Sequence, residues 1–417
     1  MNYKKVNISN VEVYLLKDTK FKTTKIKTIL INDFNKDNFT KERLLSNFLS
    51  RSTNEYKDEL SLSKRFIELY DPSIRIYDTY FKAHFKNFSL NMLNEKYTDK
   101  NITKDIIDFY FSFIFNPNFK DIKSFKENYL LSEKSLEVSY KYREEDNKFK
   151  AINNAFSLIS EEAPIKYDIN GNIDELKKIK EKDIIDLYNE ELKNSACKIF
   201  VVGDFDSDEM VNMIRDNLNN KFINKNYDFS DYIFDKKTDL TIKEDSDNIN
   251  QSILVLIYKF LGLAKDEILY TLPVFNFILG TSSSKLYRNV REKHSLAYSV
   301  YSSVNPSESY MHICAGISKE NYEKAKEKIL KEVDDMKKGN ITDEELSSAK
   351  ESFITRVKLD SDSQSNLLNL FKNYIIFDEE IDDEKIIKKV KKITINDIVN
   401  LSNKLSLDVI YFLRGDK

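Results

Sequence analysis

The stretch that decides the fold is residues 279–300, which read LGTSSSKLYRNVREKHSLAYSV. Its serines can cap a short helix, and Leu286 and Val290 lie one turn apart, so they share the buried side of that helix. Apolar and polar residues then alternate, which is typical of a half-buried strand. The segment therefore predicts a helix followed by a strand, with Arg291 near the helix C-terminus and Tyr298 early in the strand.

Both Arg291 and Tyr298 have a structural and a functional interpretation. The helix dipole favours a cation near a helix C-terminus, so Arg291 can be purely structural. Tyr298 can likewise be an ordinary strand residue. The spacing of the two residues leaves both interpretations open.

A repeat lies on either side of this stretch. Residues 177–187 read KKIKEKDIIDL and residues 391–401 read KKITINDIVNL, with six of eleven positions identical. In each copy a short apolar strand follows and ends in Gly-Asp, at 203–204 and 415–416. The shared order indicates a duplication, although coincidence in a chain rich in lysine and isoleucine is the alternative.

Strands precede helices in each copy, which predicts an α+β fold. We expect two duplicated domains, each a mainly antiparallel sheet with helices packed on one face. The N-terminal domain covers 1–225 and the C-terminal domain 241–417, with a polar linker near 221–240. The strands are expected at 11–16, 25–31, 74–80, 83–92, 252–258 and 310–317, and the helices from Thr40, within 102–160, at 267–278 and from 319 to about 401.

Composition excludes several classes of function. Lys and Arg number 66 against 69 Asp and Glu, so no nucleic-acid partner is expected. The seven glycines are too dispersed for a phosphate-binding or dinucleotide-binding loop. Cys197 and Cys314 form no C-x-x-C pair, which favours a reducing compartment. Without an apolar signal core or an apolar run long enough for a membrane span, we expect a cytoplasmic chain with no membrane partner.

Three histidines limit what metal chemistry is available: His84, His294 and His312. No two have the one-turn spacing of a zinc-binding helix. We expect His84 to have a surface or cross-strand role, with a remote site joining His84, His312 and a carboxylate as the alternative. His294 and the adjacent Ser295 do not form a nucleophile–base pair, because adjacent strand residues point to opposite faces.

Residues 280–300 resemble a segment of the insulinase/pitrilysin family of metallopeptidases, in particular its half-size, processing-peptidase-like members. That segment has a Gly/Ser-rich entry, a helix ending in L/V-R-E-K, and then x-x-L-A-Y-S-V. The family's functional Arg and Tyr are seven residues apart, as Arg291 and Tyr298 are. The duplicated α+β halves fit as well, so the resemblance covers essentially the whole chain and implies a metallopeptidase-like half clamshell.

The chain departs from this family at the zinc motif. Active members carry H-x-x-E-H, in which the histidines bind zinc and the glutamate activates water. Matching residues 51–53 to the family's K-G-T places the motif over residues 43–47, which read RLLSN. Glu133 falls near the third ligand's place, where by itself it is a surface glutamate. The resemblance therefore implies a zinc-less subunit with no metal or cofactor site, and zinc in a partner.

The resemblance implies a heterodimer in which this chain supplies Arg291 and Tyr298 in trans to a zinc-bearing subunit. Arg291 would bind a carbonyl of an extended peptide substrate, and the Tyr298 hydroxyl would stabilise the oxyanion. The alternative is a non-catalytic peptide-binding or scaffold protein of the same fold. An independent enzyme lacks a supporting residue cluster. Within the family, the nearest resemblance is to the zinc-less protein associated with elongation factor P aminopentanol modification, which leaves the substrate open.

Overall fold

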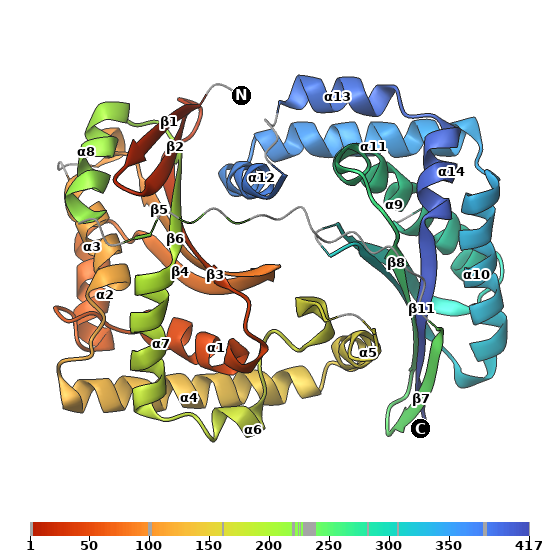
Figure 1. Cartoon of the computed structure of the whole chain (residues 1–417), viewed down its shortest axis with the longest axis horizontal. Coiled ribbons are helices and arrows are strands. Elements are labelled where there is room, and N and C mark those ends of the chain that lie inside the picture. Colours follow the sequence, from red (N-terminus) through yellow and green to blue (C-terminus); the bar gives the residue numbers. More distant parts are fainter. Residues whose placement is uncertain are drawn as a thin grey trace. The chain divides into compact units, whose positions relative to one another are not determined.

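The computed structural model divides into two compact units (Figure 1). Unit 1 comprises 1–142, 168–228 and 362–375, and unit 2 comprises 143–167, 229–361 and 376–417. The residues that the structure describes are 3–98, 102–160, 162–218, 222–223, 225, 227, 239–281, 283–306, 308–377 and 382–416.

Unit 1 contains a six-stranded sheet in the order β1-β2-β6-β3-β5-β4. Only β2 and β6 pair in parallel, and the other neighbours are antiparallel. Its strands are β1 (Lys4–Ile8), β2 (Val11–Lys17), β3 (Thr23–Asp33), β4 (Ser73–Phe81), β5 (Ala83–Leu93) and β6 (Ala196–Gly203). Its helices are η1 (Lys36–Asn38), α1 (Phe39–Leu49), α2 (Glu59–Glu68), η2 (Glu95–Tyr97), α3 (Thr103–Phe115), α4 (Ile122–Glu144), α6 (Ile173–Leu176), α7 (Glu181–Asn194), α8 (Ser207–Leu218) and most of α12 (Gln364–Phe377).

Unit 2 contains a five-stranded sheet in the order β7-β11-β8-β10-β9. Here only β7 and β11 are parallel. Its strands are β7 (Thr241–Asp247), β8 (Ser252–Phe260), β9 (Ala297–Asn305), β10 (Tyr310–Ile317) and β11 (Leu405–Gly415). Its helices are α5 (Asn147–Phe156), η3 (Pro164–Lys166), η4 (Glu267–Thr271), α9 (Leu272–Gly280), η5 (Tyr287–Glu292), η6 (Lys319–Asn321), α10 (Tyr322–Lys338), α11 (Asp343–Ser361), α13 (Asp383–Lys391) and α14 (Ile395–Asn403).

The two sheets have the same topology once β1 is set aside. The order β2-β6-β3-β5-β4 matches β7-β11-β8-β10-β9, and the parallel pair occupies the same place in both. The predicted repeat also recurs, because α7 leads into β6 and α14 leads into β11. The predicted fold class, two mainly antiparallel sheets with helices, is therefore confirmed.

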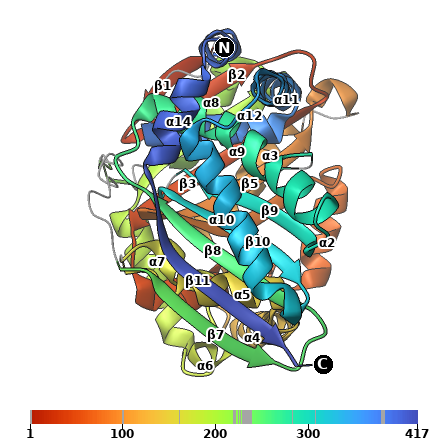
Figure 2. The same ribbon diagram turned by 90° about the vertical axis from the view of Figure 1, so that its right-hand side faces the viewer.

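Side-chain alternation along β8 separates the two faces of the second sheet. Leu254 and Leu256 belong to the core beneath helices α9, α10, α11, α13 and α14, and α10 runs across these strands (Figure 2). Ile253 and Val255 point to the opposite face and pack with Ala151 of α5. The second sheet is thus covered by one helix on the face opposite the main helical layer.

Two segments belong to a different unit from the residues on either side of them in the sequence. Residues 143–167, within the predicted range 1–225, belong to unit 2, and residues 362–375, within the predicted range 241–417, belong to unit 1. The amide of Gln364 donates to the backbone carbonyls of Thr23 and Val202, at 2.6 and 3.1 Å. These bonds hold the start of α12 on strands β3 and β6.

Helix capping differs from the sequence-based prediction. Helix α1 begins at Phe39 after Asn38, and Thr40 is not its cap. The Thr40 hydroxyl instead donates to Glu175 and accepts from the backbone N–H of Asn172. Ser284 is buried, and its hydroxyl has no hydrogen-bond partner among the described residues, so this serine caps nothing.

Two further predictions concern the linker and the membrane. The linker predicted near 221–240 lies mostly outside the described residues. In the part of the chain that the structure describes, no helix has the length and apolarity that crossing a bilayer requires.

Candidate functional site

Strand β5 carries charged side chains on the face that meets the helices of unit 1. Phe88, Leu90 and Met92 alternate along this face and belong to the apolar core. His84 and Lys86 continue the same alternation toward the start of the strand, and both are fully buried. The apolar stripe therefore turns into a charged one at this end of the sheet.

Three neighbouring elements complete the charged cluster. Strand β4 contributes the buried Asp78, and α1 contributes Glu42 and Ser46. On α7, Glu191 follows the buried Leu187 by four residues, so it lies on the face of the helix that packs inward. Glu42 and Glu191 are 2 and 5 % exposed, which makes both carboxylates interior groups.

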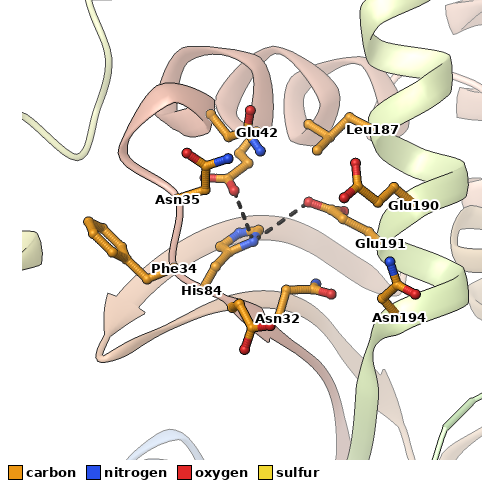
Figure 3. Close-up of a pocket in the computed structure, with 11 residues that line it drawn as sticks. Asn32, Phe34, Asn35, Glu42, His84, Leu187, Glu190, Glu191 and Asn194 are labelled. Atoms are coloured by element: carbon orange, nitrogen blue, oxygen red, sulfur yellow. Dashed lines mark ion pairs between the residues drawn. The ribbon is translucent and has the colours of Figure 1, made fainter.

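His84 is the centre of this cluster (Figure 3). Its Nε2 lies 2.7 Å from Asp78 Oδ1. Its Nδ1 lies 3.2 Å from Glu42 Oε1 and 3.6 Å from Glu191 Oε1. Its ring stacks on that of Tyr80, its cross-strand partner, with centroids 5.1 Å apart. The imidazole is thus fixed by a carboxylate on one nitrogen and directed toward two carboxylates with the other.

Lys86 balances part of the negative charge. Its Nζ donates to Asp78 Oδ1 and Ser46 Oγ, each at 3.0 Å, and lies 3.5 Å from Glu191 Oε2. Ser46 donates in turn to Asp78 Oδ2 at 2.7 Å. Asp78 therefore accepts from three donors when the bond from His84 is included, and its charge is well compensated.

Ionisation separates Asp78 from the two glutamates. Burial acts to raise the pKa of Asp78, but Lys86 and His84 outweigh burial and hold that pKa below its usual range. Burial raises the pKa of Glu191 to about 7 against the opposing effect of Lys86. Burial also raises the pKa of Glu42. Two carboxylates facing His84 Nδ1 therefore lack the compensation that Asp78 has.

A pocket of about 280 Å³ opens beside these groups. Figure 3 shows Glu42, His84 and Glu191 at its wall, together with Asn35 and Asn194. The remaining lining residues are Asn32, Asp33, Phe34, Asn38, Leu187 and Glu190. Glu42, His84 and Glu191 can each direct one ligand atom to a common point, with those atoms within 4.8 Å of one another.

The predicted surface position of His84 is wrong, because its side chain is buried, although its cross-strand role is observed. Among the described residues, the side chains that could share a metal ion with His84 are Glu42 and Glu191. His312 lies in unit 2 with its ring edge-on to Phe156 and Tyr301. Burial there lowers the pKa of His312 to about 4.

Sequence reasoning missed Glu42, Asp78 and Glu191, yet a signal was present. His84 is in phase with the apolar stripe of its strand, and Glu191 is in phase with the buried positions of its helix. A charged residue in phase with an apolar stripe is directed into the core, where burial requires a partner. The identity of the partners depends on how β4, β5, α1 and α7 pack.

The predicted pair Arg291 and Tyr298 lies in unit 2, on the elements expected. Leu286 and Val290 are buried as predicted, but the helix that ends at Glu292 is a π-helix. Arg291 is exposed, with its guanidinium 4.9 Å from the centre of the Tyr287 ring. Tyr298 is the second residue of β9 and is 67 % exposed. Both side chains are therefore open to solvent in unit 2.

Comparison with known proteins supports the resemblance. Residues 178–353 match the model described as the peptidase M16 inactive domain. The chain is similar to the probable inactive metalloprotease YmfF of Bacillus subtilis (strain 168), with 26 % identity over all of this chain and 98 % of that protein. The chain is thus similar to M16 peptidases, over residues 178–353 for the domain model and over its whole length for the relative.

Two further matches were found, one in sequence and one in fold. The chain is 29 % identical to the uncharacterized zinc protease YmxG of the same organism over 40 % of this chain and 41 % of that protein. Its fold is similar to that of a conserved protein from Enterococcus faecalis V583, with a TM-score of 0.91, 24 % identity, and coverage of 100 and 99 % of the two chains.

The residues at the positions matched to the M16 zinc motif make hydrogen bonds within the chain. Arg43 donates to Asn170 Oδ1 at 3.3 Å, and Asn47 accepts from Arg51 Nε at 3.0 Å. Ser46, in the glutamate's place, is bound within the charged cluster. Glu133 on α4 is partly exposed. The H-x-x-E-H motif is absent from this chain.

Proposed function

We propose that this chain is the non-zinc subunit of a heterodimeric M16 peptidase, in the sense that it lacks the catalytic zinc site, and that it supplies Arg291 and Tyr298 in trans to a zinc-bearing subunit. The observation that carries the proposal is the contrast between two sites in one chain. The Arg/Tyr motif is intact with both side chains exposed, whereas the zinc motif is replaced by RLLSN. Exposure supports a role for the pair outside this chain's own core.

The reaction divides between the two subunits. Zinc in the partner would activate water for attack on the scissile carbonyl. Arg291 would donate charge-assisted hydrogen bonds to a substrate carbonyl, and the Tyr298 hydroxyl would donate to the oxyanion that forms. The relative named as a zinc protease supports the existence of zinc-bearing proteins similar to this chain. We place the complex in the cytoplasm, with an extended peptide as substrate.

Co-purification with a zinc-bearing M16 subunit from the same organism, followed by an assay on an unstructured peptide, tests the proposal. Arg291→Ala and Tyr298→Phe are each expected to lower kcat/KM about 100- to 1,000-fold, because each removes a donor that acts in the transition state. The complex must form to the same extent in both variants, as measured by gel filtration.

Two matched controls come from the same helix. Arg288→Ala removes a guanidinium one turn away that pairs with Glu345. Tyr287→Phe removes a hydroxyl but keeps the ring beside Arg291. Both controls should leave kcat/KM within a few-fold of the wild-type complex. Equal turnover by Arg291→Ala, Tyr298→Phe and the controls would refute the catalytic role.

The second candidate is a non-catalytic protein that binds an extended peptide. Strand β9, which carries Tyr298, ends the order of the described strands in its sheet, so its outer edge is available for strand addition. Under this function the isolated chain binds the peptide, and a proline inside β9, such as Ser303→Pro, weakens binding while Tyr298→Phe does not. Cleavage would then be insensitive to both variants.

A further inference from the structure

The charged cluster of unit 1 has the donor set of a metal site. Asp78 already accepts from Lys86 and Ser46, so we take it as the acceptor of the bond with His84 Nε2 as well. In the neutral imidazole this assignment leaves Nδ1 as a lone-pair acceptor. Metal-binding histidines generally have this arrangement, with the second nitrogen donating to a carboxylate that fixes the ring and raises its basicity.

Two buried atoms beside the pocket lack hydrogen-bond donors, whereas Glu42 Oε2 accepts from the Tyr80 hydroxyl at 2.6 Å. His84 Nδ1 and Glu191 Oε1 are buried, and neither has a hydrogen-bond partner among the described residues. In the neutral imidazole that donates to Asp78, both are acceptors, so they cannot bond each other. Buried polar atoms without partners are uncommon, and here they converge on one point with Glu42. A cation at that point would satisfy all of them.

The spacing of these atoms suits a first-row transition metal. Zinc binds nitrogen and oxygen ligands at about 2.0 to 2.2 Å, and tetrahedral angles then put two ligand atoms about 3.4 Å apart. His84 Nδ1 lies 3.2 Å from Glu42 Oε1 and 3.6 Å from Glu191 Oε1. The 3.6 Å separation from Glu191 is longer than an N–H···O hydrogen bond, which reaches about 3.2 Å.

The local charge favours a divalent ion over a proton-bridged network. The carboxylates of Glu42, Asp78 and Glu191 all contact His84. Among the described residues, the lysine in contact with this group is Lys86, whose ammonium lies beside Asp78 and Glu191. Three carboxylates therefore contact one histidine, with one lysine beside two of them, and a divalent ion would add positive charge where Glu42 and Glu191 face His84 Nδ1.

We propose that Glu42, His84 and Glu191 bind a divalent transition-metal ion of the zinc type at a site separate from the M16 zinc motif. Asp78 positions His84 and is not itself a ligand. The 280 Å³ pocket provides the entry path and leaves the fourth position of the ion open to water or to a small anionic ligand. The imidazole selects a transition ion over magnesium or calcium, which prefer oxygen ligands.

The test uses the full chain alone, freed of metal by a chelator and then dialysed with zinc chloride. One zinc per chain is expected by elemental analysis. The melting temperature should rise by about 5 to 10 °C when free zinc exceeds the Kd 100-fold. Magnesium at the same free concentration should give neither effect. Absence of stoichiometric zinc in the wild-type chain overturns the proposal.

Matched variants locate the ion. Glu191→Gln and His84→Gln should lose the bound zinc, whereas Glu190→Gln changes a neighbouring exposed pocket residue and should retain it. Asp78→Asn should weaken zinc binding about 10- to 100-fold without abolishing it, because it alters only the support of the imidazole. Circular dichroism checks that each variant is folded.

If a His84 variant fails to fold, Glu42→Gln and Glu191→Gln take its place in the comparison. Zinc retained by a folded Glu191→Gln chain, or lost from Glu190→Gln, overturns the assignment. Peptide cleavage is not a readout here, and no partner subunit is present. A failure of this metal site therefore leaves the proposed role of Arg291 and Tyr298 untouched, and the converse also holds.

Discussion

The two units share one strand order but bury ionisable groups in opposite ways. Unit 1 places Asp78 and Lys86 in direct contact, 3.0 Å apart and fully buried. Unit 2 buries Glu308 and His312 without a countercharge contributing to the pKa of either. The pKa of Asp78 is lowered and that of Glu308 is raised, although both are carboxyls in the interior.

The difference teaches that contact with a countercharge, and not burial alone, decides the charge of an interior group. Asp78 keeps its charge because a lysine and a histidine contact it. Glu308 is hydrogen-bonded by the amide of Asn305, a neutral group, so it keeps its proton to about pH 8. Unit 1 therefore contains a polar site in its core, while unit 2 has its functional candidates at the surface.

Lys86→Met should have the largest effect on this comparison, because it removes the countercharge. Asp78 would remain buried beside Glu191 with its main cation gone. Breaking a buried ion pair on one side costs about 3 to 5 kcal/mol. We expect the free energy of unfolding to fall by that amount in urea titrations at pH 7, performed with a chelator so that bound metal contributes nothing.

Two companion variants sharpen the Lys86 result. Lys64→Met, at an exposed position on α2, should change the free energy of unfolding by less than about 0.5 kcal/mol. The double variant Lys86→Met/Asp78→Asn should recover part of the loss, because it also removes the stranded charge. A loss below 1 kcal/mol in Lys86→Met would show that the lysine does not compensate the acids.

Glu308 predicts a pH dependence that belongs to unit 2. Burial raises its pKa from 4.5 to about 8, so the folded state holds a proton that the unfolded chain releases between these values. The resulting stabilisation is complete below pH 4.5 and is lost as the pH rises through 8. Glu308→Gln should therefore remove a fall of up to about 4 kcal/mol in unfolding free energy between pH 5 and 8.5.

The measurement is the slope of unfolding free energy against pH, which does not depend on the absolute stability of the variant. Glu320→Gln, an exposed position in the same unit, should keep the wild-type slope. Identical slopes in wild type and Glu308→Gln would contradict the raised pKa of this carboxyl.

Much of the fold was predictable from sequence because its signals are local. Leu44, Leu45 and Phe48 predict the buried face of α1, and all three are buried. The Arg291/Tyr298 motif predicts a helix followed by a strand, and both form. Periodicity records which side of an element is apolar, and this information survives without tertiary structure.

The rest depended on packing between distant elements. Thr40 has a capping side chain, but its contact with Glu175 comes from a segment 135 residues away. The apolar face of α5 does not reveal which sheet it will cover. The ligands of the proposed metal site come from α1, β5 and α7, so no spacing in the sequence connects them. Only the phase of His84 and Glu191 within their elements indicated that the two side chains are buried.

The smallest predicted effect concerns the N-termini of the two repeated helices, α7 and α14. Their N-cap residues have the same backbone conformation but different side chains. Lys180 before α7 and Thr394 before α14 have nearly the same extended conformation, with φ −109° and −110°. In both, an aspartate three residues later accepts from the N-cap N–H, at 2.7 and 2.8 Å. Only Thr394 returns a bond, accepting from the N–H of Asp397. Lysine has no oxygen to do so.

Exchanging the two cap residues should therefore have opposite effects. Thr394→Lys should lower the free energy of unfolding by about 1 kcal/mol, because a helix N–H loses its acceptor. Lys180→Thr should raise it by up to about 1 kcal/mol, because the backbone there is already suited to a capping hydroxyl. Urea unfolding of both single variants measures these changes. Equal destabilisation by both variants would contradict this prediction. The two helix starts would then share only their backbone shape, and the Lys180 side chain would have a local role that the duplication does not explain.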